Sequence, residues 1–122
     1  MQIIASDQEI FMEIINIGKK NKALVVKVNG RMDAVTAPEF EKTVSLWIDK
    51  GENCFVIDLS SLEYISSAGL RSILVVAKKL KAINGQILLA AMEASVNEVF
   101  TISGFNSIIP SHDTVQAAIL QV

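Results

Sequence analysis

The sequence has very few of the residues that build disulfides and metal sites. Its one cysteine, Cys54, lies in the apolar run CFVIDL and has no second cysteine to pair with. We therefore expect a buried thiol and a reducing, cytoplasmic environment. Its one histidine, His112, has no cysteine or second histidine near it, and is expected to be an exposed loop residue. The sequence thus predicts no metal site.

Charge and hydrophobicity argue against four further classes of protein. The formal net charge of −2 provides no basic surface for nucleic acid. The apolar runs are far shorter than the roughly 20 residues that a membrane-spanning helix needs. The start, MQIIASDQEIF, lacks the basic residues and long apolar stretch of a secretory signal. With 51% hydrophobic and 20% charged residues, the chain is typical of a globular domain and not of a disordered one.

The strand pattern indicates a single domain, because no repeat, low-complexity tract or flexible linker interrupts it. Apolar runs at 11–17 and 23–28 predict an antiparallel hairpin across GKKNK. The runs at 54–59 and 86–91 are short and continuously apolar, which is typical of strands buried on both faces. A last short strand is predicted at 107–109.

Four segments have the apolar spacing and the start signals of helices. The predicted caps are, in chain order, a capping box of Thr36 and Glu39, the serine pair before a helix from about Ser67 to Ile83, a capping box of Ser95 and Glu98, and Asp113. Strands that alternate with helices predict the α/β class. We expect a mixed β-sheet of four to five strands with about four helices packed on it.

The adjacent serines Ser66 and Ser67 stand where the second helix begins. Serine is a good N-cap, worth about 1 kcal/mol, because its hydroxyl accepts a backbone N–H that lacks an intrahelical partner. One cap does not need two serines, and Gly69 weakens the first turn unless something approaches its backbone closely. A phosphate here would meet free N–H groups and the positive end of the helix dipole. The residues alone leave capping and phosphorylation both open.

Catalytic interpretations of this stretch do not fit its pattern. Around Ser67 the chain reads ISSAG, which has Ile65 where a nucleophile elbow has glycine, and His112 alone provides no triad. Asp58 ends a strand as in an aspartyl-phosphate receiver, but the earlier strands end without the carboxylate pair. No G-x-x-x-x-G-K-[ST] loop is present. We therefore expect no enzyme activity.

The second helix is predicted to have a buried face and a solvent face. The expected core stripe is Leu70, Ile73, Leu74, Ala77 and Leu80. The polar residues expected to face solvent are Arg71, Ser72, Lys78 and Lys79. Val75 is an apolar residue on the solvent side, and together with Arg71 it forms a candidate docking surface beside the serines.

Three stretches of the chain resemble the STAS domain, in particular the single-domain anti-sigma factor antagonists of bacteria. They are VNGRMDAVTAPEFEK, CFVIDLSSLEYISSAGLRSILVVAKKLKAINGQILLAAM and VNEVFTISGF. The resemblance covers 11–122 as one STAS domain and is most specific at 58–70. It leaves 1–10 as an N-terminal extension or a frayed end.

The resemblance implies a mixed sheet with helices, no catalytic centre and no cofactor. Proteins of this type bind and sequester an anti-sigma factor that is also a serine kinase, and thereby free a sigma factor. Phosphorylation of the antagonist releases the kinase, and a serine phosphatase resets the system. The net charge and the short apolar runs predict no nucleic-acid or membrane partner, and we expect a monomer or weak dimer.

The resemblance also assigns candidate site residues. The family pattern Asp-Ser-[Ser/Ala]-Gly-Leu aligns the phosphorylated serine with Ser67 and places Ser66 where the family has aspartate, so Ser66 is the second choice as acceptor. The candidate partner contacts are Asp33, which matches the family's G-x-[LM]-D motif, with Ser66, Ala68, Gly69, Arg71 and Val75. An alternative within the same family is a scaffold or assembly subunit, stressosome-like or a partner of lipid transport, that acts only through protein contacts.

Overall fold

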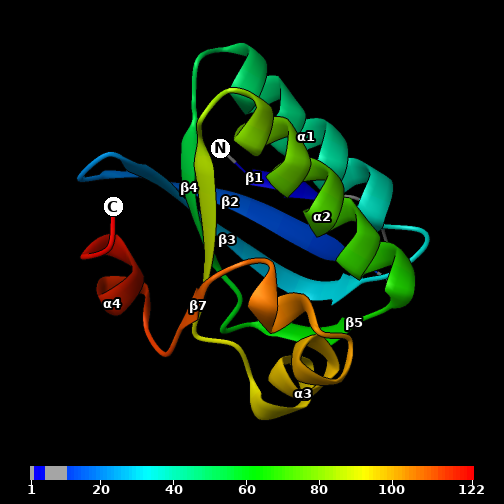
Figure 1. Cartoon of the computed structure of the whole chain (residues 1–122). Coiled ribbons are helices and arrows are strands. Elements are labelled where there is room, and N and C mark those ends of the chain that lie inside the picture. The colour runs from blue at the N-terminus through cyan, green and yellow to red at the C-terminus, as the bar shows by residue number, and fades with distance from the viewer. Residues whose placement is uncertain (1, 5–10) are drawn as a thin grey trace.

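The structure, a computed structural model, describes residues 2–4 and 11–122 and consists of a central β-sheet with helices on both faces (Figure 1). Within these residues the sheet has seven strands and the chain forms four α-helices. The elements are β1 (Gln2–Ile4), β2 (Met12–Lys20), β3 (Ala23–Met32), α1 (Ala37–Asp49), β4 (Cys54–Asp58), β5 (Leu62–Ile65), α2 (Ser67–Ala82), β6 (Gln86–Ala90), α3 (Ala94–Ile102), a 3₁₀ turn (Phe105–Ser107), β7 (Ser111–His112) and α4 (Val115–Ile119). The predicted α/β class is confirmed.

The sheet is mixed, as predicted, and its strand order is β1-β2-β3-β4-β6-β7. β1, β2 and β3 are antiparallel neighbours, whereas β3, β4, β6 and β7 are parallel. β5 lies off this path and pairs with the C-terminal end of β3 in parallel. The short strands β1, β5 and β7 raise the count above the four to five expected. Of the predicted extension 1–10, residues 2–4 form β1, while 1 and 5–10 lie outside the described residues.

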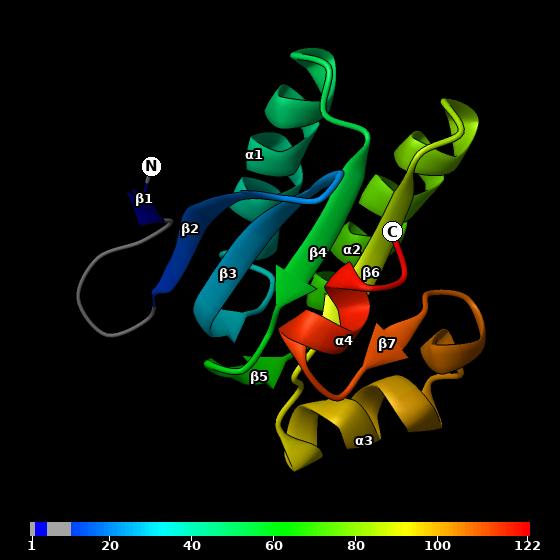
Figure 2. The same ribbon diagram turned by 90° about the vertical axis from the view of Figure 1, so that its left-hand side faces the viewer.

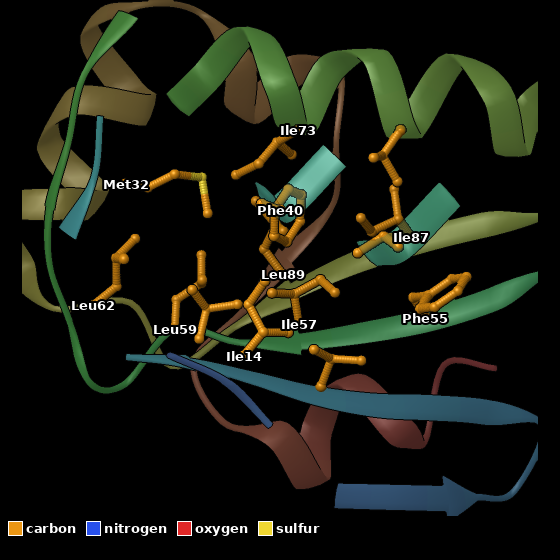
Figure 3. Close-up of a cluster of buried hydrophobic side chains, with 14 of the residues drawn as sticks. Ile14, Met32, Phe40, Phe55, Ile57, Leu59, Leu62, Ile73, Ile87 and Leu89 are labelled. Carbon is orange, nitrogen blue, oxygen red and sulfur yellow. The ribbon is translucent and has the colours of Figure 1, made fainter. Parts of the chain in front are cut away.

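The central strands are buried on both faces, which explains their continuous apolar sequence. Alternate residues of each strand enter two different clusters. Ile57 and Leu89 point toward α1 and α2, into the large core shown in Figure 3. Val56 and Leu88 point the other way, toward Ala118 and its neighbours on α4. Cys54 lies in this second cluster, so the predicted burial of the thiol is confirmed.

The helices divide the surface of the sheet between them (Figures 1 and 2). α1 and α2 lie next to each other on one face, and α4 lies on the opposite face over β4 and β6. α3 packs beside β5 at the end of the sheet where β3 stops, with Val96 and Phe100 buried in the large core. This arrangement leaves the starts of α1 and α2 accessible at that same end.

The predicted hairpin is confirmed, and its strands are longer than expected. β2 and β3 extend to a turn of two residues, Asn21 and Lys22, and Asn21 adopts a positive φ of 56°. Asparagine tolerates this left-handed conformation better than most residues, which makes the tight turn accessible to the sequence.

Both predicted capping boxes are wrong. Thr36 precedes α1, but its hydroxyl does not cap the helix; it donates to the Arg31 carbonyl oxygen at 2.7 Å instead. α3 begins at Ala94 after Glu93, so Ser95 lies inside the first turn and is not a cap. Both sequence motifs are present, but neither forms a capping box. At Thr36 the hydrogen bond to the Arg31 carbonyl oxygen determines the geometry, and at Ser95 the earlier start of α3 does.

The C-terminal region differs from the prediction in three details. The expected strand at 107–109 follows the 3₁₀ turn, and the real strand, β7, is Ser111–His112. His112 is therefore half-buried in a strand and is not an exposed loop residue. The cap of α4 is Thr114, whose hydroxyl accepts from the Ala117 N–H at 3.0 Å, and not Asp113. The predicted helix itself is present.

α2 spans Ser67–Ala82, close to the predicted range. Leu70, Ile73 and Leu80 are buried as expected, but Ser72 is buried too, at 4% exposure. The Ser72 hydroxyl donates to the Gly69 carbonyl oxygen at 2.8 Å, so its burial leaves no unpaired hydroxyl. The prediction that Ser72 faces solvent is therefore wrong, because the first turns of α2 lie closer to α1 and β3 than the apolar spacing indicated.

Candidate functional site

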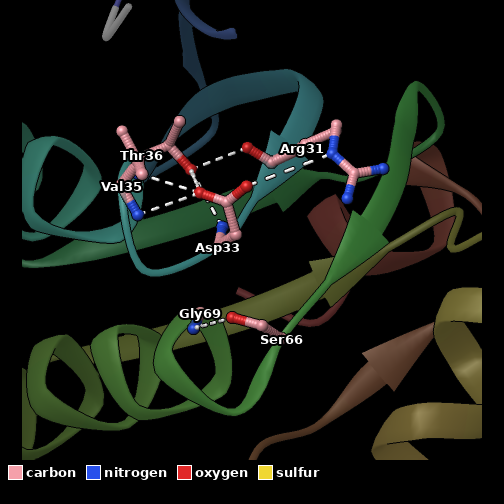
Figure 4. Close-up of polar contacts among 6 residues, drawn as sticks. All are labelled: Arg31, Asp33, Val35, Thr36, Ser66 and Gly69. Atoms are coloured by element: carbon pink, nitrogen blue, oxygen red, sulfur yellow. Dashed lines mark hydrogen bonds and ion pairs between the residues drawn. The ribbon is translucent and has the colours of Figure 1, made fainter. Parts of the chain in front are cut away.

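Two loops meet at the end of the sheet where β3 and β5 stop. The strands are parallel and end in register, with Met32 opposite Ile65. The next N–H, that of Ser66, donates to the Met32 carbonyl oxygen at 2.9 Å. The loop 33–36 then leads into α1, and Ser66 leads into α2, so Asp33 and the two serines lie at the same end of the sheet. Figure 4 shows Asp33 and Ser66 in these two loops.

The two serines occupy different positions at the start of α2. Ser66 is the N-cap: its backbone is extended, and its hydroxyl accepts from the Gly69 N–H at 3.2 Å. Ser67 is the first residue of the helix, and it is exposed to solvent. One serine therefore provides the cap, and the other is left with an accessible hydroxyl in the first turn, near the positive end of the helix dipole.

Gly69 is buried because the chain itself approaches it closely. A Cβ at this position would lie 2.6 Å from the Met32 carbonyl oxygen and 2.7 Å from Cγ1 of Ile65. The glycine thus allows α2 to pack directly against the end of β3. The close approach that the sequence predicted is present, but β3 makes it, and Gly69 offers no side chain or exposed surface to a partner.

Asp33 organises the loop before α1. Its Oδ1 accepts from the Val35 N–H at 3.0 Å and from the Thr36 N–H at 3.2 Å, while its own N–H donates to the Thr36 hydroxyl at 2.9 Å (Figure 4). Asp33 Oδ2 lies 4.0 Å from Nε of Arg31. Asp33 therefore holds the loop that precedes α1 and does not cap the helix itself, whose N-cap position is Thr36. One edge of the Asp33 carboxylate remains beside a cation.

Arg31 extends the polar part of this region onto β5. Its guanidinium lies over the ring of Tyr64, 4.2 Å from the ring centroid. Both side chains are substantially exposed, with Tyr64 at 40%. A cation over an aromatic face at an exposed site is worth about 0.5–1 kcal/mol. This pair was not predicted, since β5 was not recognised as a strand.

A shallow groove of about 200 Å³ separates the first turns of α1 and α2. It is lined from α2 by Ala68, Arg71, Ser72 and Val75, and from the α1 side by Ala34, Ala37, Pro38 and Glu41. Val35, in the same loop, is 62% exposed. The groove brings together three of the predicted partner contacts, Ala68, Arg71 and Val75. Sequence reasoning missed the α1 wall, although an apolar Val35 in a polar turn was a usable signal.

Metal chemistry and a membrane span find no support in the described part of the chain. No group of three or more histidine, cysteine, aspartate and glutamate side chains is placed to hold a metal ion there. Among the helices of the described residues, none has the length and apolar character needed to cross a membrane.

Comparison with known proteins gives the same family from sequence and from structure. A candidate anti-sigma factor antagonist of Bordetella bronchiseptica, BtrV, is 39% identical over 104 residues, which cover 85% of this chain and 90% of BtrV. The crystal structure of an anti-sigma factor antagonist from Mycobacterium paratuberculosis superposes with a TM-score of 0.81 at 25% identity, over 91% of this chain and 93% of that one.

A further solved structure shares the fold at lower identity. The Bacillus cell fate determinant SpoIIAA in its phosphorylated form superposes with a TM-score of 0.66 at 19% identity, covering 90% of this chain and 97% of SpoIIAA. The sequence pattern of the STAS domain matches residues 15–118. This chain therefore belongs to the STAS domain family.

Proposed function

We propose that this protein is a partner-switching regulator controlled by phosphorylation of Ser67. In the unphosphorylated form it binds and sequesters an anti-sigma factor that is also a serine kinase, and a sigma factor is released. Phosphorylation ends the complex, and a serine phosphatase restores it. The chain contributes a binding surface and an acceptor hydroxyl and performs no chemistry of its own. The observation that carries the proposal is the exposed Ser67 beside a separate capping serine.

The division between the two serines supports Ser67 as the acceptor. The Ser66 hydroxyl already accepts a hydrogen bond from Gly69, and Ser66 is only half-exposed. The Ser67 hydroxyl is exposed, and no cap is lost when it is modified. A phosphate at the first residue of a helix lies near backbone N–H groups that lack intrahelical partners, so the fold accommodates it. SpoIIAA, which has the same fold, has been solved in a phosphorylated form.

The surface around Ser67 supports a partly apolar contact with a partner. The groove between α1 and α2 is lined by Ala34, Pro38, Ala68 and Val75, and the exposed Val35 lies in the adjoining loop. Burying such a surface against a protein partner is favourable. A phosphate would place close to two negative charges beside it, and desolvating them costs several kcal/mol, enough for a hundredfold or larger loss of affinity.

The names of the relatives support the class of partner. BtrV is named as a candidate anti-sigma factor antagonist and the Mycobacterium paratuberculosis protein as an anti-sigma factor antagonist. A Staphylococcus aureus relative that is 23% identical over 90 residues is named an anti-sigma-B factor antagonist. A partner of this class is expected in the cytoplasm. Arg71, which is exposed and lines the groove four residues after Ser67, is the charged contact that we assign to the partner's surface.

Phosphorylation by the cognate anti-sigma factor kinase and ATP tests the acceptor directly. We expect mass spectrometry to find one phosphate on Ser67 in the wild type and in Ser66→Ala, and none in Ser67→Ala. Ser66→Ala is the matched control, because it removes the neighbouring hydroxyl and leaves Ser67 in place. A phosphate mapped to Ser66, or an equal yield in Ser67→Ala, would show that the acceptor is wrong.

Binding of the same kinase tests the switch. Ser67→Ala should bind as tightly as the unphosphorylated wild type, also in the presence of ATP, whereas Ser67→Glu should bind much more weakly. Titration calorimetry measures both affinities. Equal affinity of the two variants would contradict a switch at this residue, even if Ser67 is phosphorylated.

A further inference from the structure

A second concave site lies at the other end of α2, away from Ser67. A cavity of about 410 Å³ opens between the C-terminal half of α2, the start of β6 and the segment before β7. Its apolar lining consists of Leu74, Ala77, Ile87, Ile108, Ile109 and Pro110. Volumes of 300–1,000 Å³ with mostly apolar walls are typical of sites for small organic molecules. None of the residues that line the groove between α1 and α2 belongs to it.

The walls come from elements that are far apart in the sequence. α2 supplies residues three or four apart, which form one side of the helix, and Ile87 of β6 supplies the floor. Ile108 and Pro110 form the opposite wall. Pro110 is held in place because its carbonyl oxygen accepts from the Leu89 N–H at 2.9 Å. One wall of the cavity is thus the helix α2, which packs on the sheet, and the other is the segment that Pro110 fixes to β6 by a backbone hydrogen bond.

Ile108 remains 57% exposed at this cavity, although it is a large apolar residue. Its neighbour Ile109 is buried at 2%. An isoleucine at the rim of an apolar cavity gains contacts when an aliphatic group enters, since the entering group removes it from water. The shape and lining therefore favour an aliphatic chain as the occupant.

The charged residues that line the cavity indicate which head group the aliphatic chain carries. Lys78 and Lys81 line the cavity on the α2 side, and no acidic residue lines it. Within the described residues neither lysine has an ion-pair partner; the adjacent Lys79 donates to Ser45 on α1. Two unpaired ammonium groups beside an apolar cavity complement one anionic head group.

We propose that this cavity binds a medium-chain carboxylate, with the aliphatic chain between α2 and Ile108 and the carboxylate at Lys78 and Lys81. The proposal is independent of the phosphorylation of Ser67, because it uses none of the residues of that site. The occupant that we propose is a free small molecule and not a lipid of a membrane surface, because the site is a cavity between α2 and the segment before β7.

Titration of the full-length, ¹⁵N-labelled protein with sodium octanoate tests the site. We expect saturable shifts of the amide resonances of Leu74, Ala77, Ile87 and Ile109. Hexanoate, two methylenes shorter, should bind about fifteenfold more weakly, because each buried methylene changes the affinity about fourfold. Octyltrimethylammonium, which has the same chain and the opposite charge, should give no saturable shifts.

Two pairs of variants locate the contacts. Lys78→Gln with Lys81→Gln should weaken octanoate binding about fivefold, the effect of two exposed charge pairs. Lys42→Gln on α1 with Lys50→Gln just after it should leave the affinity unchanged, because both lysines are exposed and lie outside the cavity. Ile108→Asp should weaken octanoate tenfold or more, since it places a carboxylate in the apolar wall. Ile102→Asp is the matched control, because Ile102 is 77% exposed and lies outside the cavity.

The proposal is overturned by any of three results. The first is the absence of saturable shifts at the cavity residues on addition of octanoate. The second is an octanoate affinity that is the same in the lysine and Ile108 variants as in the wild type. The third is equally strong binding of the cationic analogue. Sedimentation with phosphatidylglycerol vesicles tests whether the two lysines bind a membrane surface instead. Vesicle binding without octanoate binding would assign the two lysines to a membrane surface and would also overturn it.

Discussion

α1 and α2 start next to each other at the same end of the sheet, yet the chain fixes the two starts by different means. Side-chain hydrogen bonds hold the loop before α1, where Asp33 and Thr36 bind each other and the backbone. Backbone packing holds the start of α2, where Gly69 lies against Met32 and only the Ser66 hydroxyl provides a side-chain cap. The polar side chains before α1 are thus engaged in the hydrogen bonds that hold its loop. At the start of α2, Ser67 is exposed and takes no part in the cap.

The largest expected effect is at the packed start of α2. Gly69→Ala would place a methyl group 2.6 Å from the Met32 carbonyl oxygen, and backbone cannot move aside easily. Overpacking of this kind costs more than the roughly 1 kcal/mol that alanine gains as a helix former, so we expect a net loss of about 2 kcal/mol in the free energy of unfolding. Urea unfolding measures it. A gain in stability would mean that α2 is not held against β3.

The hydrogen-bonded start of α1 should respond next. Asp33→Ala removes the acceptor for the Val35 and Thr36 N–H groups and should lower the free energy of unfolding by about 1.5 kcal/mol. Asp33→Asn keeps an oxygen in the same position and should lose less than half as much. If both variants were equally destabilised, the charge beside Arg31 would hold the loop, and not the hydrogen bonds.

The cap of α2 comes third. Ser66→Ala removes the acceptor for the Gly69 N–H and should reduce the free energy of unfolding by about 1 kcal/mol. Ser66→Asp restores the aspartate of the family pattern, which is also a good N-cap, and should keep nearly full stability. Thermal unfolding followed by circular dichroism distinguishes the two. A stable Ser66→Ala would move the capping role to Ser67.

The smallest effect is expected at Ser67. Because Ser67 is exposed and is not the cap, Ser67→Ala should change the free energy of unfolding by less than about 0.5 kcal/mol. The measurement is the same urea unfolding as for Gly69→Ala, a variant in the same helical turn. A loss as large as that of Ser66→Ala would show that Ser67 has a structural role.

Much of the fold was predictable because its signals are local. The range of α2 followed from apolar spacing, and the burial of β4 and β6 followed from their continuous apolar runs. β5 was missed because its sequence, LEYI, is short and half-exposed. It is a strand only because β3, about thirty residues earlier in the chain, provides a parallel partner at Gly30 and Met32. No local pattern encodes that pairing.

The site was predictable in part for the same reason. Ser67, Ala68, Arg71 and Val75 belong to one helix, and their shared face follows from its periodicity. The capping box at Thr36 was a false signal, because Asp33 competes for the same loop and its hydrogen bonds decide the outcome. The burial of Gly69 and Ser72 depends on how closely α2 approaches β3, a distance that propensity and spacing do not contain.

The attachment of α2 to β3 has a consequence for how fast this region can respond. With the Ser66 N–H bonded to Met32 and no room beside Gly69, the helix start cannot swing outward without breaking the end of the sheet. A group added to Ser67 would therefore change the surface at that residue directly, and no slow rearrangement of α2 would be needed. The time course of such a signal would be set by the enzymes that add and remove the group, and the domain itself would add no delay.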